Sequence, residues 1–337
     1  MGKCGVRSGR VSHEELLNIR KAILMTKKHS KYKRLLERCK ALPPTPTAVA
    51  HPCDKTSIQG AIEAAELGLL TPILVGPRGK IEAAARQSGT DISRYEVIDA
   101  PHSNAAAEAA VRLVREGKAE MLMKGSLHTD ELLSAVVARD TGLRTGRRIS
   151  HCFIMDVPAI DRVLVITDAA VNVFPTLEDK VHIIQNAIDL AHALGKPQPK
   201  VAILSAMETV NPKVQSTIEA AALCKMADRG QITGGLLDGP LALDNAINLT
   251  AARIKKIESP VAGVADILVA PDLEAGNMLA KSLSFLADAD AAGIVLGARV
   301  PIILTSRADS VTTRLASCAV AVLVAKFRRD SGGEMAA

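Results

Sequence analysis

Short runs of valine, isoleucine and leucine alternate along the chain with longer stretches in which apolar residues recur every three or four positions. The short runs are continuously apolar, as strands are when both faces of their sheet are covered. We predict strands at residues 73–75, 121–123, 163–167, 201–205, 267–270, 294–296 and 302–305. Strands that alternate with helices predict an α/β fold with largely parallel sheets.

The clearest helical pattern runs from Leu177 to Leu194. Its apolar positions are spaced by three and four residues and therefore share one face: Leu177, Val181, Ile184, Ile188, Ala191 and Leu194. Thr176 precedes the pattern, and Asp179 follows three residues later, which is close to a capping box. Gly195 and Pro197 predict where this helix ends.

Polar residues follow the predicted strands, and ligands of open α/β sheets bind beyond the carboxyl ends of strands. The candidate site residues at such positions are Lys124, Gly125, Ser126, His128, Thr129, Asp168, Asn172, Asp238, Asn277, Ser306, Arg307 and Asp309. The acids among them are also common as helix caps and turn residues, and Asp238 could equally be a magnesium ligand.

The segment 306–310 is the most suggestive of these loops. A helix that begins near Asp309 or Ser310 offers free backbone N–H groups and the positive end of its dipole. Arg307 adds a planar fork that can bind phosphate through two hydrogen bonds. The alternative is an ordinary N-cap beside a surface arginine, and from this loop alone the two interpretations are equally good.

Lys124 and Gly125 resemble half of a phosphate cradle, because glycine lets the backbone approach a ligand and lysine supplies a point charge. The chain has no G-x-x-x-x-G-K-[ST] segment, and no G-x-G-x-x-G follows a predicted strand. A P-loop ATPase and an ordinary Rossmann dehydrogenase are therefore disfavoured. No histidine and carboxylate cluster has metal-ligand spacing, so we expect no metal site.

Composition and charge narrow the function further. A chain of 337 residues predicts two domains, and its six cysteines form no C-x-x-C pair, so we expect reduced thiols in the cytoplasm. No apolar run is long enough to span a membrane, and we expect no secretory signal. Residues 1–40 carry twelve Lys and Arg against three acids, and this leader predicts a solvated, mostly helical segment or else a nucleic-acid contact. With 2% aromatic residues, we favour no nucleic-acid partner.

Taken together and in order, the segments 73–77, 123–125, 166–172, 238–244, 271–277 and 305–309 resemble the phosphate acetyltransferase/phosphate butyryltransferase family. The resemblance covers about residues 45–326, and the segments 123–125 and 238–244 look more like the butyryl branch. It implies a reaction in which short-chain acyl-CoA and phosphate interconvert with acyl phosphate and free CoA. This reaction would proceed by direct thiol attack in a ternary complex. It implies no tightly bound cofactor, no membrane partner and a homodimer.

The resemblance also implies an isocitrate-dehydrogenase-like α/β fold with the active site in an interdomain cleft. Domain I would comprise residues 41–150 and 295–337, and domain II, which dimerises, would comprise 151–294. Ser306 and Arg307 match the family's catalytic pair, but Thr313 occupies the place of the catalytic aspartate in the acetyl branch. Asp309, as the only carboxylate in 306–317, is therefore assigned the base role, and the alternatives are a base from another region of the fold or the phosphate itself. Arg139 and Arg144 are candidates for binding CoA.

Two other functions stay open at this point. One is a metal- and NAD(P)-dependent decarboxylating dehydrogenase on the same fold, which would need an aspartate triad for Mg²⁺ and an arginine cluster. The other is a non-catalytic protein that binds CoA or nucleic acid. Phosphate-dependent release of CoA would distinguish the acyltransferase from both.

Overall fold

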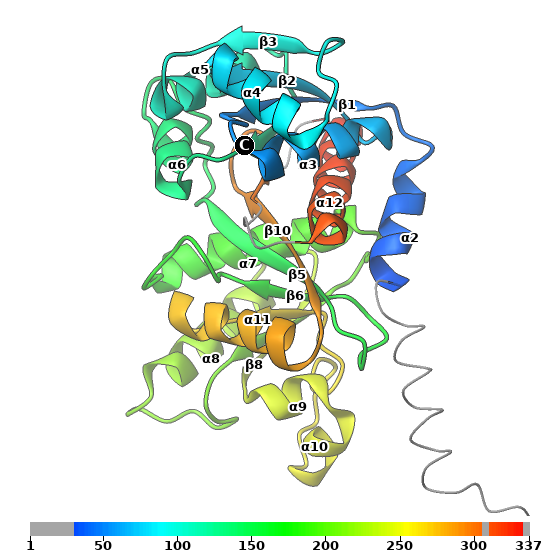
Figure 1. Cartoon of the computed structure of the whole chain (residues 1–337). Helices are drawn as coiled ribbons and strands as arrows, with labels where there is room; N and C mark the ends of the chain where they lie inside the picture. Colours follow the sequence, from blue (N-terminus) through cyan, green and yellow to red (C-terminus); the bar gives the residue numbers. More distant parts are fainter. Residues whose placement is uncertain (1–29, 305–309, 333–337) are drawn as a thin grey trace, which may run out of the picture.

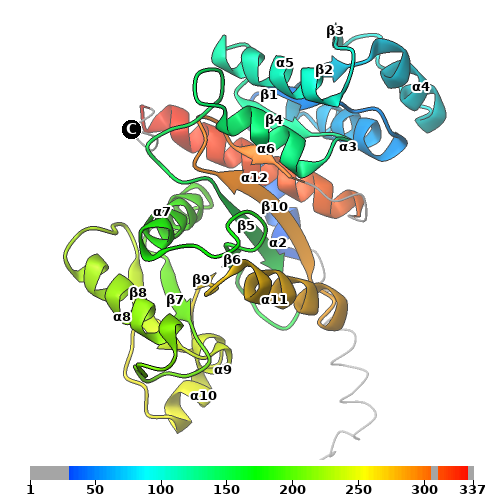
Figure 2. The ribbon, with the colours of Figure 1, turned by 90° about the vertical axis from the view of Figure 1, so that its left-hand side faces the viewer.

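The computed structural model describes residues 30–304 and 310–332. Its centre is a mixed sheet of eleven strands in the order β3-β2-β1-β4-β11-β10-β5-β6-β9-β7-β8 (Figures 1 and 2). Seven neighbouring pairs are parallel, and the three antiparallel pairs join β11, β10, β5 and β6 in the middle. The predicted α/β class with a mostly parallel sheet is confirmed.

The first half of the chain alternates strands and helices. In chain order they are β1 (Thr45–Ala50), α3 (Lys55–Glu66), β2 (Leu70–Gly76), α4 (Arg78–Ser88), β3 (Glu96–Asp99), α5 (Ser103–Arg115), β4 (Met121–Lys124) and α6 (Thr129–Val137). All four of these strands run parallel, because each is followed by a helix that returns the chain to the other end of the sheet.

The second half supplies the remaining seven strands. They are β5 (Ser150–Asp156), β6 (Leu164–Thr167), β7 (Lys200–Leu204), β8 (Leu236–Leu241), β9 (Ile267–Val269), β10 (Asp290–Leu296) and β11 (Ile302–Ile303). The helices of this half are α7 (Leu177–Ala193), α8 (Gln215–Asp228), α9 (Leu243–Ile247), α10 (Leu249–Ile254), α11 (Leu273–Leu286) and α12 (Val311–Asp330). With β11, the chain returns to the first half of the sheet and pairs with β4.

The seven predicted strands correspond to β2, β4, β6, β7, β9, β10 and β11, apart from residue 305, which lies outside the described residues. Four strands were missed, and each carries polar, small or turn-forming residues that hide the apolar run: β1, β3, β5 and β8. The predicted helix is α7, with Thr176 and Asp179 in a capping box and Gly195 just past its end at a φ of 85°.

One face of the sheet is covered by a single apolar core. Side chains from α2 (Ser30–Cys39), α3, α4, α7, α8 and α12 meet the sheet there, with Met123, Cys152 and Ile203 among the strand residues. The opposite face carries two separate cores. One lies under α5 and α6, and the other lies under α9, α10 and α11. The sheet is therefore continuous, but its second face is divided.

Helix α2, the last part of the basic leader, is not solvated as expected. Lys31 and Tyr32 are buried, and Nζ of Lys31 lies 2.5 Å from Oδ1 of Asp156 at the end of β5. The Tyr32 hydroxyl donates to the carbonyl of Ile154 at 2.5 Å and accepts from the N–H of Ala292 at 2.6 Å. The apolar face of this short helix closes the core, which its many cations concealed in the sequence. No helix in the described part of the chain is long and apolar enough to cross a membrane.

Candidate functional site

The strand order places a topological switch point between β1 and β4. The chain leaves β1 for α3, which lies in the core of one face, and leaves β4 for α6, which covers the opposite face. Such a switch point, at the carboxyl ends of parallel strands, is where open α/β sheets bind ligands. Residues 51–54 and 124–128 follow these two strands (Figure 2).

Gly125 holds the two loops together. Its N–H donates to the carbonyl of Ala50 at 2.8 Å, and the N–H of Ser126 donates to the carbonyl of His51 at 2.9 Å. A Cβ at Gly125 would lie 2.4 Å from the Ala50 carbonyl oxygen and 2.5 Å from that of His51. Glycine is therefore required by the close approach of two backbones, and not only by the approach of a ligand.

Ser126 connects the β4 loop to His51. Its hydroxyl donates to the His51 carbonyl at 2.8 Å, and its Oγ lies 3.0 Å from Nδ1 of the same residue. It also accepts from the N–H of Cys53 at 3.3 Å. His51 has a φ of 54°, a left-handed conformation that is uncommon for residues other than glycine and is found at functional sites more often than elsewhere.

Lys124 is the last residue of β4, and the register of β4 with β11 ends in the pair of Met123 and Ile303, so that Lys124 and Leu304 each follow this pair directly. Leu304 is the residue immediately before segment 305–309, so the candidates Ser306, Arg307 and Asp309 lie outside the described residues. Beyond that segment, Ser310 caps α12 and accepts from the N–H of Thr313 at 3.1 Å. The prediction that a helix begins near residue 310 is confirmed.

His128 and Thr129 stand at the start of α6. The N–H of His128 donates to Oε2 of Glu131 at 2.7 Å, while Oε1 of Glu131 accepts from the Ser103 hydroxyl at 2.5 Å. His128 itself is exposed and Thr129 is partly buried. The structure therefore brings five candidates, from Lys124 to Thr129, to one edge of the sheet, together with His51.

A second group gathers where β6 ends. The carboxylate of Asp168 is buried and accepts from the backbone N–H groups of Ala170 and Val171 at 2.9 and 3.1 Å. The Asn172 side-chain amide donates to Asp168 at 2.5 Å and to the carbonyl of Ile149 at 2.9 Å. Asn277 on α11 donates to the carbonyl of Ala169 at 3.0 Å. Asp168, Asn172 and Asn277 thus share one hydrogen-bond network.

Asn172 also orients an arginine. Its Oδ1 accepts from Nε of Arg148 at 2.8 Å, and Nη1 of Arg148 lies 3.4 Å from Oδ1 of Asp179. Arg148 and the candidate Arg144 line a cavity of about 620 Å³ between α6, segment 144–149 and the start of α7. Arginine, asparagine and backbone donors in one cavity suit a ligand that carries phosphate groups.

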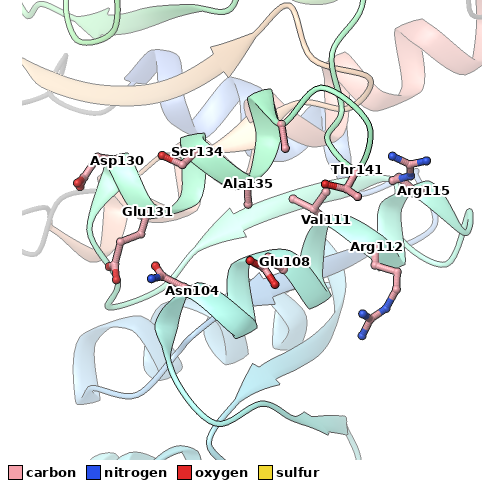
Figure 3. A pocket seen from close by; sticks show the side chains of 11 residues that line it. Asn104, Glu108, Val111, Arg112, Arg115, Asp130, Glu131, Ser134, Ala135 and Thr141 are labelled. Atoms are coloured by element: carbon pink, nitrogen blue, oxygen red, sulfur yellow. The ribbon is translucent and has the colours of Figure 1, made fainter.

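A larger cavity of about 700 Å³ lies between α5 and α6. Figure 3 shows Arg112 and Arg115 toward one end of it and Asp130 and Glu131 toward the other. None of the candidate site residues lines this cavity. Its lining has three carboxylates and two arginines, whereas the smaller cavity has three arginines and two carboxylates, so the smaller cavity is the better anion site despite its size.

The structure does not bring Asp238 to the other candidates. It lies inside β8, the edge strand seven steps from β4 in the sheet, which is about 34 Å along the sheet at about 4.8 Å per step. Asp168 follows β6, four steps from β4 and therefore about 19 Å away along the sheet. Asp168 and Asp238 were grouped with Lys124 because the rule that ligands bind beyond the ends of strands does not distinguish strands that run in opposite directions. In this sheet β6 is antiparallel to β5, and β11 and β10 are antiparallel to each other.

Electrostatics distinguish the titratable groups at the site. Burial, together with the positive charge of Lys80, lowers the pKa of His51, so its imidazole is neutral at pH 7. Burial raises the pKa of the Cys53 thiol to about 11, which leaves this cysteine unreactive. His51 and Arg148 were not among the residues predicted from the sequence. A prediction of β1 would have made His51 a candidate, because this histidine is the first residue after the strand.

Comparison with known proteins agrees with this architecture. A family model described as phosphate acetyl/butaryl transferase matches residues 103–322. A phosphate acetyltransferase from Rhizobium meliloti is 67% identical over 89% of this chain and 95% of its own length. A phosphate butyryltransferase from Clostridium beijerinckii is 44% identical over 87% of this chain and 97% of its own length.

The fold matches a solved structure as well. The crystal structure of a branched-chain phosphotransacylase from Enterococcus faecalis V583 superposes with a TM-score of 0.74 at 29% identity. The match covers 83% of this chain and 99% of that chain. The similarity therefore extends over both halves of the sheet.

Proposed function

Because the chain belongs to the phosphate acetyl/butyryltransferase family and is a phosphate acyltransferase, we propose that it transfers a short acyl group, acetyl first, between CoA and phosphate. The reaction joins acyl-CoA and phosphate to give acyl phosphate and CoA. The 67% identity to a protein named phosphate acetyltransferase supports acetyl over butyryl, although the motifs of segments 123–125 and 238–244 look more like the butyryl branch.

The active site of this proposal is the edge of the sheet beyond β1, β4 and β11. The observation that carries it is the parallel register of β4 with β11: Lys124 directly follows Met123, and Leu304 directly follows its partner Ile303, two positions before Ser306 in the chain. An ammonium and a guanidinium from adjacent strand ends would hold the negative charge of the phosphate. Ser306 would donate a hydrogen bond to the carbonyl oxygen under attack.

The cavity lined by Arg144 and Arg148 would hold the phosphate groups of CoA. Asn172, itself held by Asp168, supports this assignment because it fixes the direction of the Arg148 guanidinium. Binding both substrates at fixed positions supplies much of the rate acceleration, since the reaction needs neither a covalent acyl-enzyme nor a tightly bound cofactor or metal.

We assign two domains to the sheet: residues 41–150 with 295–337, and residues 151–294, as in an isocitrate-dehydrogenase-like fold. The two separate cores under α5–α6 and under α9–α11 support this division. The edge of the sheet beyond β1, β4 and β11 would border the cleft between them. The five described cysteines are free, in keeping with a cytoplasmic enzyme.

The second domain would form a homodimer through α11 and the neighbouring loop. Phe285, Leu286 and Met278 are 83%, 86% and 61% exposed on α11, and Phe174 is 78% exposed in the loop that contacts its start. An apolar face of this kind is expected to be covered. Phe285→Lys should shift the enzyme from dimer to monomer in light scattering, whereas a dimer that persists would place the interface elsewhere.

The activity test is phosphate-dependent release of CoA from acetyl-, propionyl- and butyryl-CoA. We expect the highest kcat/KM with acetyl-CoA and a loss of about 10³-fold in Arg307→Ala and about 10²-fold in Lys124→Ala. Arg86→Ala, an exposed arginine on α4, is the control and should keep full activity. Arg307→Ala with near-normal turnover would refute the phosphate site, and butyryl-CoA as the best substrate would refute the acetyl assignment.

A further inference from the structure

We propose that Nε2 of His51 is the base that takes the proton from the thiol of CoA, with Ser126 as the residue that positions it. This inference rests on the proposed function and names a catalytic group for it. The sequence analysis assigned this role to Asp309, because Thr313 stands where the acetyl branch has its aspartate.

The position of His51 is the first argument. It follows β1 at the switch point and lies against the loop that begins with Lys124 and Gly125. Its φ of 54° is held by hydrogen bonds of the neighbouring backbone: its N–H donates to the Val75 carbonyl at 2.7 Å, and its carbonyl accepts from Ser126. A strained conformation that the surroundings enforce is a feature of residues placed for function.

The Ser126 hydroxyl positions the imidazole. Nδ1 of His51 lies 3.0 Å from Oγ of Ser126, and which of the two atoms donates depends on the tautomer of the ring. Our proposal uses the tautomer in which Nδ1–H donates to Ser126, whose own hydroxyl donates to the His51 carbonyl at 2.8 Å. In a neutral imidazole, a protonated Nδ1 leaves the lone pair on Nε2. Among the residues that the structure describes, Nε2 forms no hydrogen bond.

The charge state of His51 agrees with a base. Burial and Lys80 at the start of α4 lower its pKa, whereas Glu131 on α6 and Asp54 at the start of α3 oppose the shift. The net direction is downward, so the imidazole is unprotonated at neutral pH and ready to accept.

The neighbouring acids are engaged elsewhere. Oδ1 of Asp54 accepts from the N–H of Ser57 at 2.7 Å as the cap of α3. Both oxygens of Glu131 accept hydrogen bonds, from Ser103 and from the backbone of His128. Cys53 has a pKa raised to about 11. Unlike these groups, His51 has a ring nitrogen, Nε2, that no described residue occupies with a hydrogen bond.

The step balances as follows. The S–H proton of CoA moves to Nε2 as the sulfur attacks the carbonyl carbon of the acyl phosphate. The bond between that carbon and the bridging phosphate oxygen then breaks, and the imidazolium returns the same proton to the leaving phosphate. The products are acyl-CoA, hydrogen phosphate and neutral His51, and the reverse reaction uses the same proton in the opposite order.

The test uses two variants of the full-length enzyme. His51→Asn tolerates the left-handed backbone but has no base, and His51→Gly relieves the strain and leaves room for free imidazole. We expect kcat/KM with acyl phosphate and CoA to fall about 10²–10³-fold in both, and imidazole to restore His51→Gly at least tenfold. The acid limb of the wild-type profile, below pH 6.5, should disappear in both variants.

The controls separate this inference from the proposed function. His102→Asn keeps an N-cap on α5 at the same edge and should leave the rate and the pH profile unchanged. Equilibrium binding of CoA should also persist in the His51 variants. If His51→Asn keeps the acid limb, if imidazole does not restore His51→Gly, or if Asp309→Asn alone abolishes the limb, His51 is not the base. Wild-type enzyme without phosphate-dependent turnover would instead refute the proposed function.

Discussion

Nζ of Lys31 lies 2.5 Å from Oδ1 of Asp156, although 125 positions separate the two residues in the chain. Both side chains are buried, and Asp156 Oδ2 also accepts from the backbone N–H of Lys31 at 3.0 Å. A residue of the basic leader thus neutralises a carboxylate at the end of β5, in the middle of the sheet. The leader and the body of the enzyme form one folded unit at this point.

Breaking this pair should destabilise the fold. Lys31→Met leaves the Asp156 carboxylate buried without its cation, and we expect urea denaturation to report a loss of about 3–5 kcal/mol. Lys40→Met is the matched control, because its pair with Glu37 is exposed on both sides and should change little. Equal stability of the two variants would show that the buried pair contributes nothing.

Gly125→Ala tests the contact between the loops after β1 and β4. The added Cβ would overlap backbone atoms of Ala50 and His51, which cannot rotate away as a side chain can. We expect a loss of about 1–3 kcal/mol in thermal unfolding and a lower kcat, because Lys124 and His51 move. Gly79→Ala, where the Cβ meets nothing within 4 Å, should be neutral. A Gly125→Ala enzyme with normal stability and turnover would contradict the close packing.

The sequence predicted the α/β class and seven strands, because buried parallel strands form continuous apolar runs. It missed β1 and β5, whose runs are interrupted by Pro46 in one and His151 in the other. The order in which the strands pair in the sheet cannot be read from a single sequence either. Candidates such as Lys124 and Asp238 were therefore pooled as strand-end residues although they lie seven strand steps apart.

Local motifs were more reliable where one short segment settles the geometry. The capping box of Thr176 and the helix start at Ser310 needed only neighbouring residues. Asp168 and Asn172 were both candidates that follow one predicted strand, but their hydrogen bonds to each other and to Arg148 depend on tertiary contacts. The leader was predicted to be solvated because of its charge. Its charged residues outnumber the few apolar residues that it buries.

Asn172→Ala tests whether Arg148 is held for substrate. The substitution removes the acceptor of Arg148 Nε and frees the guanidinium. We expect KM for acyl-CoA to rise about tenfold with little change in kcat, as for a contact made equally in the ground state and the transition state. Arg148→Ala should show the same pattern. A lower kcat at constant KM in both variants would instead place Arg148 at the reacting atoms.

His151 makes stability depend on acidity. It is 1% exposed in β5, and burial lowers its pKa to about 4, although the nearby Asp168 carboxylate opposes the shift. In the unfolded chain this histidine has its ordinary pKa of 6.5, so below pH 6.5 the unfolded chain binds a proton that the folded protein does not bind. The stabilisation is complete above pH 6.5 and is lost as the pH falls toward 4, to a limit of roughly 3 kcal/mol.

Urea denaturation of wild type and His151→Gln at pH 4.5, 5.5 and 7 measures this loss. The glutamine does not titrate, so its unfolding free energy should fall less steeply than that of wild type, and parallel curves would assign the acid sensitivity to other groups.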